Sequence, residues 1–304
     1  MKLGLVSAIL DDYTFEEAID TAAGMGFECV EMACWPKQKA ERRYAGVSHI
    51  DVTRLDEAKT KYIQEYCRNK SVEISALAFY PNLLDADERK RNENITHLLK
   101  VIDASFRLNV GMVTTFIGRD QAKTVQENLI IMQDIWKPII RYAEERDVKI
   151  AIENCPMLFD ENQWPGGQNL MTTPEIWKKI FDLLPSDSLG LNYDPSHFVW
   201  QMMDYIQPIY DFSKKIFHVH YKDIKLYPEK LKKVGTTAYP LEYMSPKIPG
   251  LGDVDWGKFA SALTDIGYNG YSCIEIEDRA FEGTEEKLMN SLRLAETYMR
   301  QFVI

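Results

Sequence analysis

The sequence lacks long uninterrupted hydrophobic segments. Of its 304 residues 45% are hydrophobic, yet no apolar run approaches the ~18 residues that a membrane-spanning helix needs. The first apolar stretch, within MKLGLVSAIL, is broken at Asp11 and Asp12 and is too short for a secretory signal peptide. We therefore expect a cytoplasmic protein that has no membrane as a partner.

Cysteine is scarce and positive charge is in deficit. The five cysteines show no CxxC spacing and their number is odd, so neither a disulfide framework nor a Cys-type zinc site is expected. The 36 lysines and arginines are outnumbered by 46 aspartates and glutamates, which gives a formal net charge of -10. Binding to a nucleic-acid backbone requires Lys and Arg to neutralise phosphates, so the charge argues against a nucleic-acid partner.

The sequence also lacks a linker and a glycine-rich phosphate loop. No stretch rich in Pro, Gly and Ser divides the chain, so we expect a single domain over residues 1–304. The first expected strand runs into LVSAILDDY, which has no glycine-rich turn. This disfavours the alternative fold, a doubly wound open sheet.

What the sequence does contain is an alternation of short apolar strands with amphipathic helices. Strands are expected at residues 2–6, 28–32, 73–79, 110–116, 148–153, 189–194, 216–220 and 271–277. Helices are expected at residues 14–26, 51–70, 85–108, 121–147, 173–184, 200–214, 255–266 and 284–302. The first of these opens with Thr14 as N-cap and Glu17 at the capping-box position. Eight strand–helix repeats predict an α/β fold, a (β/α)₈ TIM barrel.

Long loops follow the second, fifth and seventh strands, at residues 33–50, 154–172 and 224–254. In a barrel such loops lie at the C-terminal face, where active sites are found. They predict a covered pocket there, and surface decoration is the alternative.

The last four strands each end in a carboxylate or an imidazole. These residues are Glu153, Asp194, His220 and Glu275. Any one of these residues alone could be a helix cap or a core residue. All four at the same end of adjacent strands, however, bring three carboxylates together. Burying them without a cation would cost several kcal/mol per charge. The pattern therefore predicts a divalent metal, and the oxygen-rich set suits Mn²⁺, Mg²⁺ or Co²⁺, with Zn²⁺ as an alternative.

The seventh strand carries a second histidine, His218. Strand alternation puts His218 and His220 on one face, with His218 about 6–7 Å deeper. That depth predicts a buried histidine that hydrogen-bonds within the barrel and supports the ligands above it.

Five motifs carry a family resemblance. IEN, D-P-S-H, H-V-H-Y-K-D, I-E-I-E and the P-G-x-G-x-V-D-W stretch of Pro249 to Trp256 resemble the xylose isomerase-like TIM-barrel superfamily. It includes sugar isomerases and epimerases, inosose dehydratases and endonuclease IV-type enzymes. The resemblance spans essentially the whole chain. It implies that Glu153, Asp194, His220 and Glu275 bind one divalent ion, Mn²⁺ first, and that His197 faces the substrate.

The resemblance implies a metal-dependent sugar or sugar-phosphate isomerase or epimerase. Glu153 and Glu275 are the candidate catalytic residues, removing and returning a proton next to a carbonyl through a metal-stabilised enediolate. The alternatives are a lyase, dehydratase or deglycosidase-type subunit acting on keto-sugars or 3-keto-glycosides, and a non-catalytic sugar-binding subunit. DNA repair is disfavoured because Phe79–Tyr80 and Phe116 stand where those enzymes need histidines.

Further residues are candidates for binding the carbohydrate. Lys222 would polarise a hydroxyl or bind a phosphate, unless it pairs with Asp223. Aromatic rings commonly pack on the C–H face of a sugar, and Trp35, Phe116 and Trp164 lie in or near the expected loops. The resemblance is also compatible with a homodimer or homotetramer.

Overall fold

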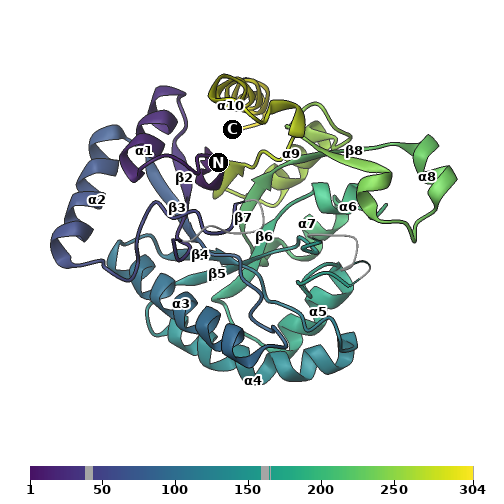
Figure 1. The fold of residues 1–304 in the computed structure, drawn as a ribbon, viewed down its shortest axis with the longest axis horizontal. Coiled ribbons are helices and arrows are strands. Elements are labelled where there is room, and N and C mark those ends of the chain that lie inside the picture. Colours follow the sequence, from purple (N-terminus) through teal and green to yellow (C-terminus); the bar gives the residue numbers. More distant parts are fainter. Residues whose placement is uncertain (38–43, 159–163, 165, 304) are drawn as a thin grey trace.

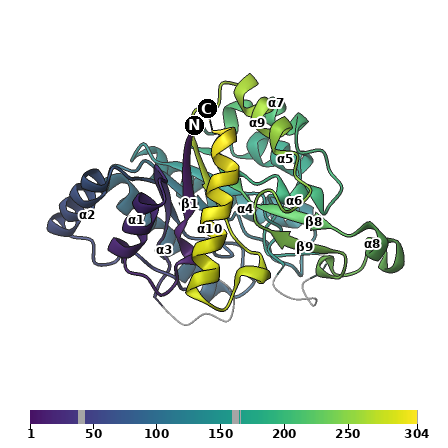
Figure 2. The same cartoon turned by 90° about the horizontal axis from the view of Figure 1, so that it is seen from above.

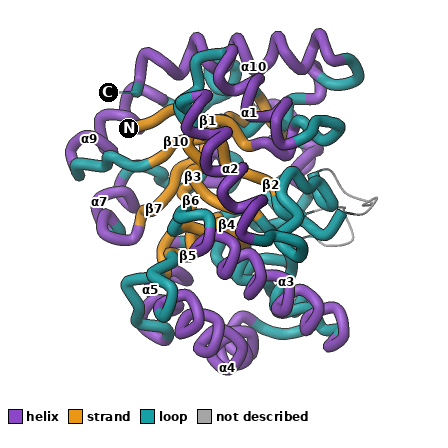
Figure 3. Tube along the Cα trace, turned by 90° about the vertical axis from the view of Figure 1, so that its left-hand side faces the viewer, coloured by secondary structure: helices purple, strands orange, loops and turns teal. Residues whose placement is uncertain are grey.

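Eight parallel strands form a closed barrel that helices surround (Figures 1 and 3). The structure, a computed structural model, describes residues 1–37, 44–158, 164 and 166–303. Around the barrel the strands follow the order β1-β10-β7-β6-β5-β4-β3-β2, and β1 pairs in parallel with β10. The barrel prediction is confirmed, because this closing pair excludes an open sheet. The strands are β1 (Lys2–Val6), β2 (Cys29–Ala33), β3 (Glu73–Ala78), β4 (Met112–Thr115), β5 (Lys149–Glu153), β6 (Leu189–Tyr193), β7 (Ile216–Tyr221) and β10 (Tyr271–Ile274).

Except between residues 196 and 214, the helices lie close to their expected positions. They are α1 (Phe15–Gly24), α2 (Glu57–Lys70), α3 (Glu88–Arg107), α4 (Val125–Glu144), α5 (Pro174–Leu183), α6 (Ser196–Val199), α7 (Gln207–Asp211), α9 (Trp256–Asp265) and α10 (Glu285–Met299). The capping box of Thr14 and Glu17 opens α1 as predicted. None of the helices within the described residues is long and apolar enough to cross a membrane.

The helix expected at residues 200–214 is present only in part. The structure has the shorter α7 there, and α6 ends before residue 200. The side chain of Asp204 accepts the backbone N–H of Ile206 at 2.7 Å. This local turn competes with helix formation, which explains why the helix begins only at Gln207.

The long segment after β7 folds into an arm rather than an irregular loop. β8 (Asp223–Leu226) and β9 (Met244–Lys247) pair in antiparallel fashion, and α8 (Pro228–Val234) lies between them. The arm, residues 223–247, projects away from the barrel (Figures 1 and 2).

Asp223 holds the root of this arm. Its carboxylate accepts the backbone N–H groups of Ile224, Gly250 and Val254 and the indole N–H of Trp256, at 2.8 to 3.1 Å. The P-G-x-G-x-V-D-W stretch thus returns the chain from the arm to α9.

Close packing inside the barrel requires glycine in the middle of β1. Gly4 is in register with Cys29 on one side and Cys273 on the other. A Cβ at Gly4 would lie 2.5 Å from both the carbonyl oxygen and the Sγ of Cys29. The three strands can therefore approach only because this residue has no side chain.

Candidate functional site

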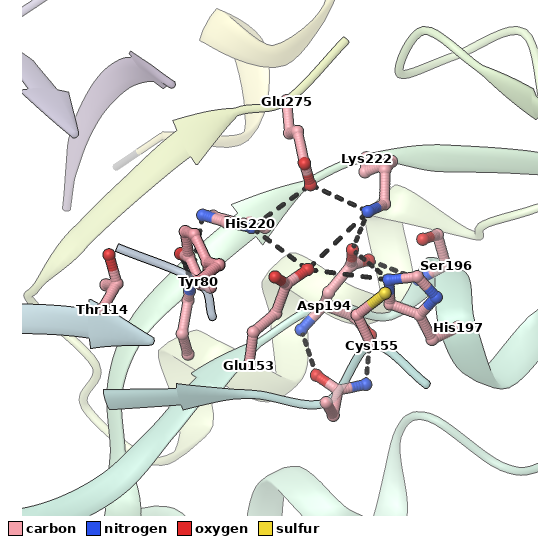
Figure 4. A network of polar contacts seen from close by, with 12 residues as sticks. Tyr80, Thr114, Glu153, Cys155, Asp194, Ser196, His197, His220, Lys222 and Glu275 are labelled. Atoms are coloured by element: carbon pink, nitrogen blue, oxygen red, sulfur yellow. Dashed lines mark hydrogen bonds and ion pairs between the residues drawn. The ribbon is translucent and has the colours of Figure 1, made fainter. Parts of the chain in front are cut away.

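The ends of four barrel strands bring the predicted metal ligands together. Glu153 ends β5, Asp194 follows β6, His220 lies in β7 and Glu275 follows β10. One nitrogen or oxygen from each residue lies within 4.8 Å of the other three (Figure 4). We call these four residues the donor cluster. The strands are neighbours in the barrel order, which is why residues far apart in the sequence converge.

The donor cluster contains atoms that lack hydrogen bonds. Glu153 Oε1, Asp194 Oδ2 and His220 Nδ1 are buried and have no well-oriented hydrogen bond within the described residues, only ion-pair contacts with Lys222, His197 and other members of the cluster. Buried polar atoms are normally hydrogen-bonded, so three such atoms facing one another point to a ligand. Three carboxylates and one imidazole suit a divalent ion. The residues present therefore fit such a metal, although the set does not select among Mn²⁺, Mg²⁺, Co²⁺ and Zn²⁺.

Lys222 reaches into the donor cluster. Its Nζ lies 2.8 Å from Glu275 Oε2, 3.0 Å from Asp194 Oδ2 and 3.7 Å from Glu153 Oε1. The alternative of an ion pair with Asp223 is wrong, because the Asp223 carboxylate instead accepts four hydrogen bonds at the root of the arm. Burial alone would lower the pKa of Lys222, but the surrounding carboxylates outweigh it and hold the pKa well above its usual value.

His197 lies at the edge of the same cluster, on α6. Its Nε2 is 3.2 Å from Asp194 Oδ2 and 3.6 Å from Glu153 Oε1. Apart from these two contacts of Nε2, neither ring nitrogen has a hydrogen-bond partner within the part of the chain that the structure describes, although the ring is buried. This position next to the donor atoms is the one expected of a residue that contacts a substrate.

The environment shifts the pKa values of the three cluster carboxyl groups in different directions. For Glu153 and Asp194, burial would raise the pKa, but the Lys222 ammonium and His197 outweigh it. The pKa of Glu153 falls well below its usual value and that of Asp194 falls to about 2. Burial dominates at Glu275, whose pKa is raised despite Lys222.

A layer of polar side chains lies deeper in the barrel, beneath the donor cluster. His218 is fully buried, with Nδ1 3.0 Å from Asn192 Oδ1 and Nε2 3.1 Å from Ser75 Oγ. Asn192 in turn lies 2.9 Å from His220 Nε2. The prediction of a buried, hydrogen-bonded histidine below His220 is confirmed.

Glu31 is the acidic residue of this layer, and the sequence analysis missed it together with Asn192 and Ser75. Glu31 is fully buried in β2, and its Oε2 lies 2.7 Å from His220 Nε2. Burial would raise its pKa, but His220, His218 and Tyr80 outweigh it and lower the pKa. The available signal was a lone acidic residue inside the apolar strand of ECVEM.

The three predicted aromatic residues have different surroundings. Phe116 packs 4.7 Å from the ring of Tyr80, whose centroid is 6.4 Å from that of His220. Trp35 packs edge-on against Phe79. Trp164 donates its indole N–H to the carbonyl of Thr237 in the arm. Phe116 thus lies next to the donor cluster through its contact with Tyr80. The contacts of Trp35 and Trp164 are with Phe79 and with the arm instead.

Comparison with curated proteins finds relatives along most of the chain. YfiH of Bacillus subtilis strain 168 is 26% identical over 313 residues, covering 91% of this chain and 93% of its own. An inosose dehydratase of Clostridium perfringens strain ATCC 13124 is 30% identical over 164 residues, which is 53% of each chain. The second match therefore spans about half of either protein.

Solved structures share the fold across its full length. The IolI protein with a bound zinc atom has a TM-score of 0.73 at 20% identity, covering 100% of this chain and 99% of its own. A D-psicose 3-epimerase with D-tagatose from Clostridium cellulolyticum H10 has a TM-score of 0.72 at 15% identity, with the same coverage. The sequence profile of the family described as "Xylose isomerase-like TIM barrel" matches residues 19–298. The chain therefore belongs to the xylose isomerase-like TIM-barrel family.

Proposed function

We propose that this chain is a metal-dependent enzyme that removes and returns a proton next to the carbonyl of a sugar, as an isomerase or epimerase. The observation that carries the proposal is the convergence of the donor cluster, with three buried atoms that lack hydrogen bonds. Glu153, Asp194, His220 and Glu275 would hold one divalent ion, with Mn²⁺ our first choice. When bound, such an ion supplies a Lewis acid for the sugar's carbonyl and neighbouring hydroxyl.

Glu153 and Glu275 are the proposed catalytic residues. Glu153 ends β5 and Glu275 follows β10, and these are the outer two of the four neighbouring strands that carry the cluster. A substrate between them would meet one carboxyl group on each face, so that one takes the proton and the other returns it. Return to the same carbon inverts its configuration, and return to the adjacent carbon interconverts aldose and ketose.

Lys222 and His197 are proposed to bind substrate oxygens. Both contact cluster oxygens at about the distance of a hydrogen bond, so a substrate chelated at the cluster would lie within their reach. Of the three predicted aromatic residues, Phe116 is the best placed to border the substrate, through its contact with Tyr80. The roles of Trp35 and Trp164 stay predictions.

The charge around the cluster favours an uncharged sugar over a sugar phosphate. Among the described residues, the single ammonium group of Lys222 faces four carboxylates. These belong to Glu153, Asp194, Glu275 and Glu277. The buried carboxylate of Glu31 adds further negative charge beneath them. One divalent ion and Lys222 would offset only part of the charge of these five carboxylates, and a phosphate would add more negative charge, so a neutral keto-sugar fits better.

A second candidate reaction is dehydration or another elimination from the same kind of substrate. The match to inosose dehydratase over 53% of this chain favours it. Both reactions begin by removing the proton next to the carbonyl, so the second differs only in expelling a leaving group.

Exchange of substrate hydrogen with solvent deuterium tests the proposal. With the Mn²⁺-loaded protein and a panel of ketoses and keto-inositols, we expect deuterium at the carbon next to the carbonyl. Glu153→Gln and Glu275→Gln should each lower this rate by about 10²-fold or more, as expected when a general acid or base is removed. The Glu73→Gln variant is the control and should exchange normally. Glu73 is the first residue of β3, at the end of the barrel away from the donor cluster.

The products separate the two reactions. An epimerase or isomerase gives a product of unchanged mass, whereas a dehydratase gives one that is lighter by one water. Undiminished exchange in both glutamine variants would refute the assignment of the catalytic residues.

A further inference from the structure

We infer that Glu31 is a positioning residue that fixes which ring nitrogen of His220 faces the donor cluster. By accepting a hydrogen bond from the Nε2–H of His220, it leaves the lone pair on Nδ1 directed at the other ligands. The inference rests on the metal site in the proposed function, but it concerns residues of this chain and is independent of the substrate.

The two nitrogens of His220 face different surroundings. Nδ1 lies 3.5 Å from Glu153 Oε1 and 3.3 Å from Glu275 Oε2, inside the donor cluster. Nε2 lies 2.7 Å from Glu31 Oε2, in the deeper polar layer. A neutral imidazole carries one N–H, and the nitrogen that binds a metal must be the other one. The position of the proton therefore decides whether His220 can act as a ligand.

The hydrogen bonds around Glu31 make it an acceptor. Its second oxygen, Oε1, lies 2.7 Å from the Tyr80 hydroxyl and 3.1 Å from the Thr114 hydroxyl. Both hydroxyls can donate to it, so the buried carboxylate has partners on each oxygen. Glu31 stands on β2, which does not pair with β7, and so it reaches His220 across the barrel interior.

Asn192 also approaches Nε2 of His220, at 2.9 Å through its amide nitrogen. An amide nitrogen can only donate, and this one also lies 3.0 Å from the Tyr80 hydroxyl. If Nε2 accepted from Asn192, its lone pair would face the carboxylate of Glu31 at 2.7 Å. A hydrogen bond to the charged acceptor is the stronger arrangement, and it places the proton on Nε2.

Nitrogen NMR on the full-length protein tests the tautomer directly. The sequence has five histidines, so ¹⁵N-histidine labelling gives a small set of signals, and His220→Gln identifies the signal of His220. In the Zn²⁺-loaded protein, which is diamagnetic, we expect the proton of His220 on Nε2 and the metal on Nδ1. A proton on Nδ1 of His220 would overturn the inference.

Metal affinity tests the contribution of Glu31. Competition with a chelator should show that Glu31→Gln weakens Zn²⁺ and Mn²⁺ binding by about 10–100-fold, because the amide can donate as well as accept and no longer fixes the tautomer. The matched control is Glu28→Gln, three residues earlier, where the carboxylate contacts Leu3 N and Arg300. Ser75→Ala, which removes a partner of His218 instead, controls for disturbance of the barrel interior.

The outcomes distinguish this inference from the proposed function. Unchanged affinity in Glu31→Gln, or an equal loss in Glu28→Gln, would overturn the role of Glu31 while leaving the exchange reaction standing. Conversely, a protein that binds Zn²⁺ through Nδ1 and depends on Glu31, yet exchanges no substrate hydrogen, would support this inference and refute the function. The tautomer and the metal affinity, which test this inference, are both measured without substrate.

Discussion

At the scale of single residues, the barrel interior tolerates little change in volume. We predict that Gly4→Ala lowers the free energy of unfolding by about 1–3 kcal/mol, the usual cost of overpacking a core. The new Cβ would lie 2.5 Å from the carbonyl oxygen of Cys29, and this backbone atom can move only if β2 moves. Urea denaturation followed by circular dichroism measures the change.

Gly24→Ala is the matched control for this prediction. Gly24 is the last residue of α1, and a Cβ there meets nothing within 4 Å. Alanine should be neutral or stabilise by up to about 1 kcal/mol, because it favours the helix. Equal effects of the two substitutions would mean that space in the barrel interior is not what requires Gly4.

The residues of the donor cluster could be predicted because each stands at the end of its own strand. Counting along four apolar runs was enough to place Glu153, Asp194, His220 and Glu275 at one level. Glu31 could not be found in that way, since its partner His220 lies 189 positions away in the sequence. Only the curvature of the closed barrel brings β2 and β7 face to face.

At the scale of elements, the arm after β7 depends on one buried carboxylate. We predict that Asp223→Ala lowers the free energy of unfolding by more than about 2 kcal/mol, because four N–H donors lose their acceptor. Hydrogen exchange should accelerate most in the segment from Gly250 to Trp256. Mass spectrometry of peptides after deuterium labelling measures this directly.

Asp253→Asn provides the comparison within the same region. Asp253 accepts the backbone N–H of Leu226 in the arm, but at an exposed position. Its replacement should cost about 1 kcal/mol or less, since the amide oxygen of Asn or a water molecule can accept the same N–H. An equal acceleration of exchange in both variants would show that Asp223 does not hold the root of the arm.

Element boundaries were predictable where local chemistry decides them. Thr14 and Glu17 gave the start of α1 because a capping box acts over four residues. The arm was not predicted, because the pairing of β8 with β9 joins Asp223 to Lys247 across 23 intervening residues. Asp204, which delays α7, is likewise visible only once its contact with Ile206 is known.

At the scale of the whole molecule, metal binding should be coupled to folding, because the donor cluster exists only in the closed barrel. We predict that a divalent ion at 100 times its dissociation constant raises the free energy of unfolding by about 2.7 kcal/mol. Denaturation of chelator-treated protein with and without Mn²⁺ measures the gain. A homo-oligomeric state and a cytoplasmic location stay predictions at this scale.

Two variants control the metal prediction. His220→Gln removes a ligand and should abolish most of the gain in stability. Glu73→Gln alters a carboxylate that pairs with Lys2 and Tyr271 at the other end of the barrel, and it should preserve the gain. Equal stability of the chelator-treated wild-type protein with and without Mn²⁺ would contradict the metal site.

The order of the strands around the barrel also determines when such a site can form during synthesis. Three donors come from β5, β6 and β7, but Glu275 follows β10, which pairs with β1 and closes the barrel. A nascent chain that has emerged only through β7 therefore carries three of the four donors. The complete metal site arises with the last strand, so uptake of the ion would mark a finished barrel on the ribosome.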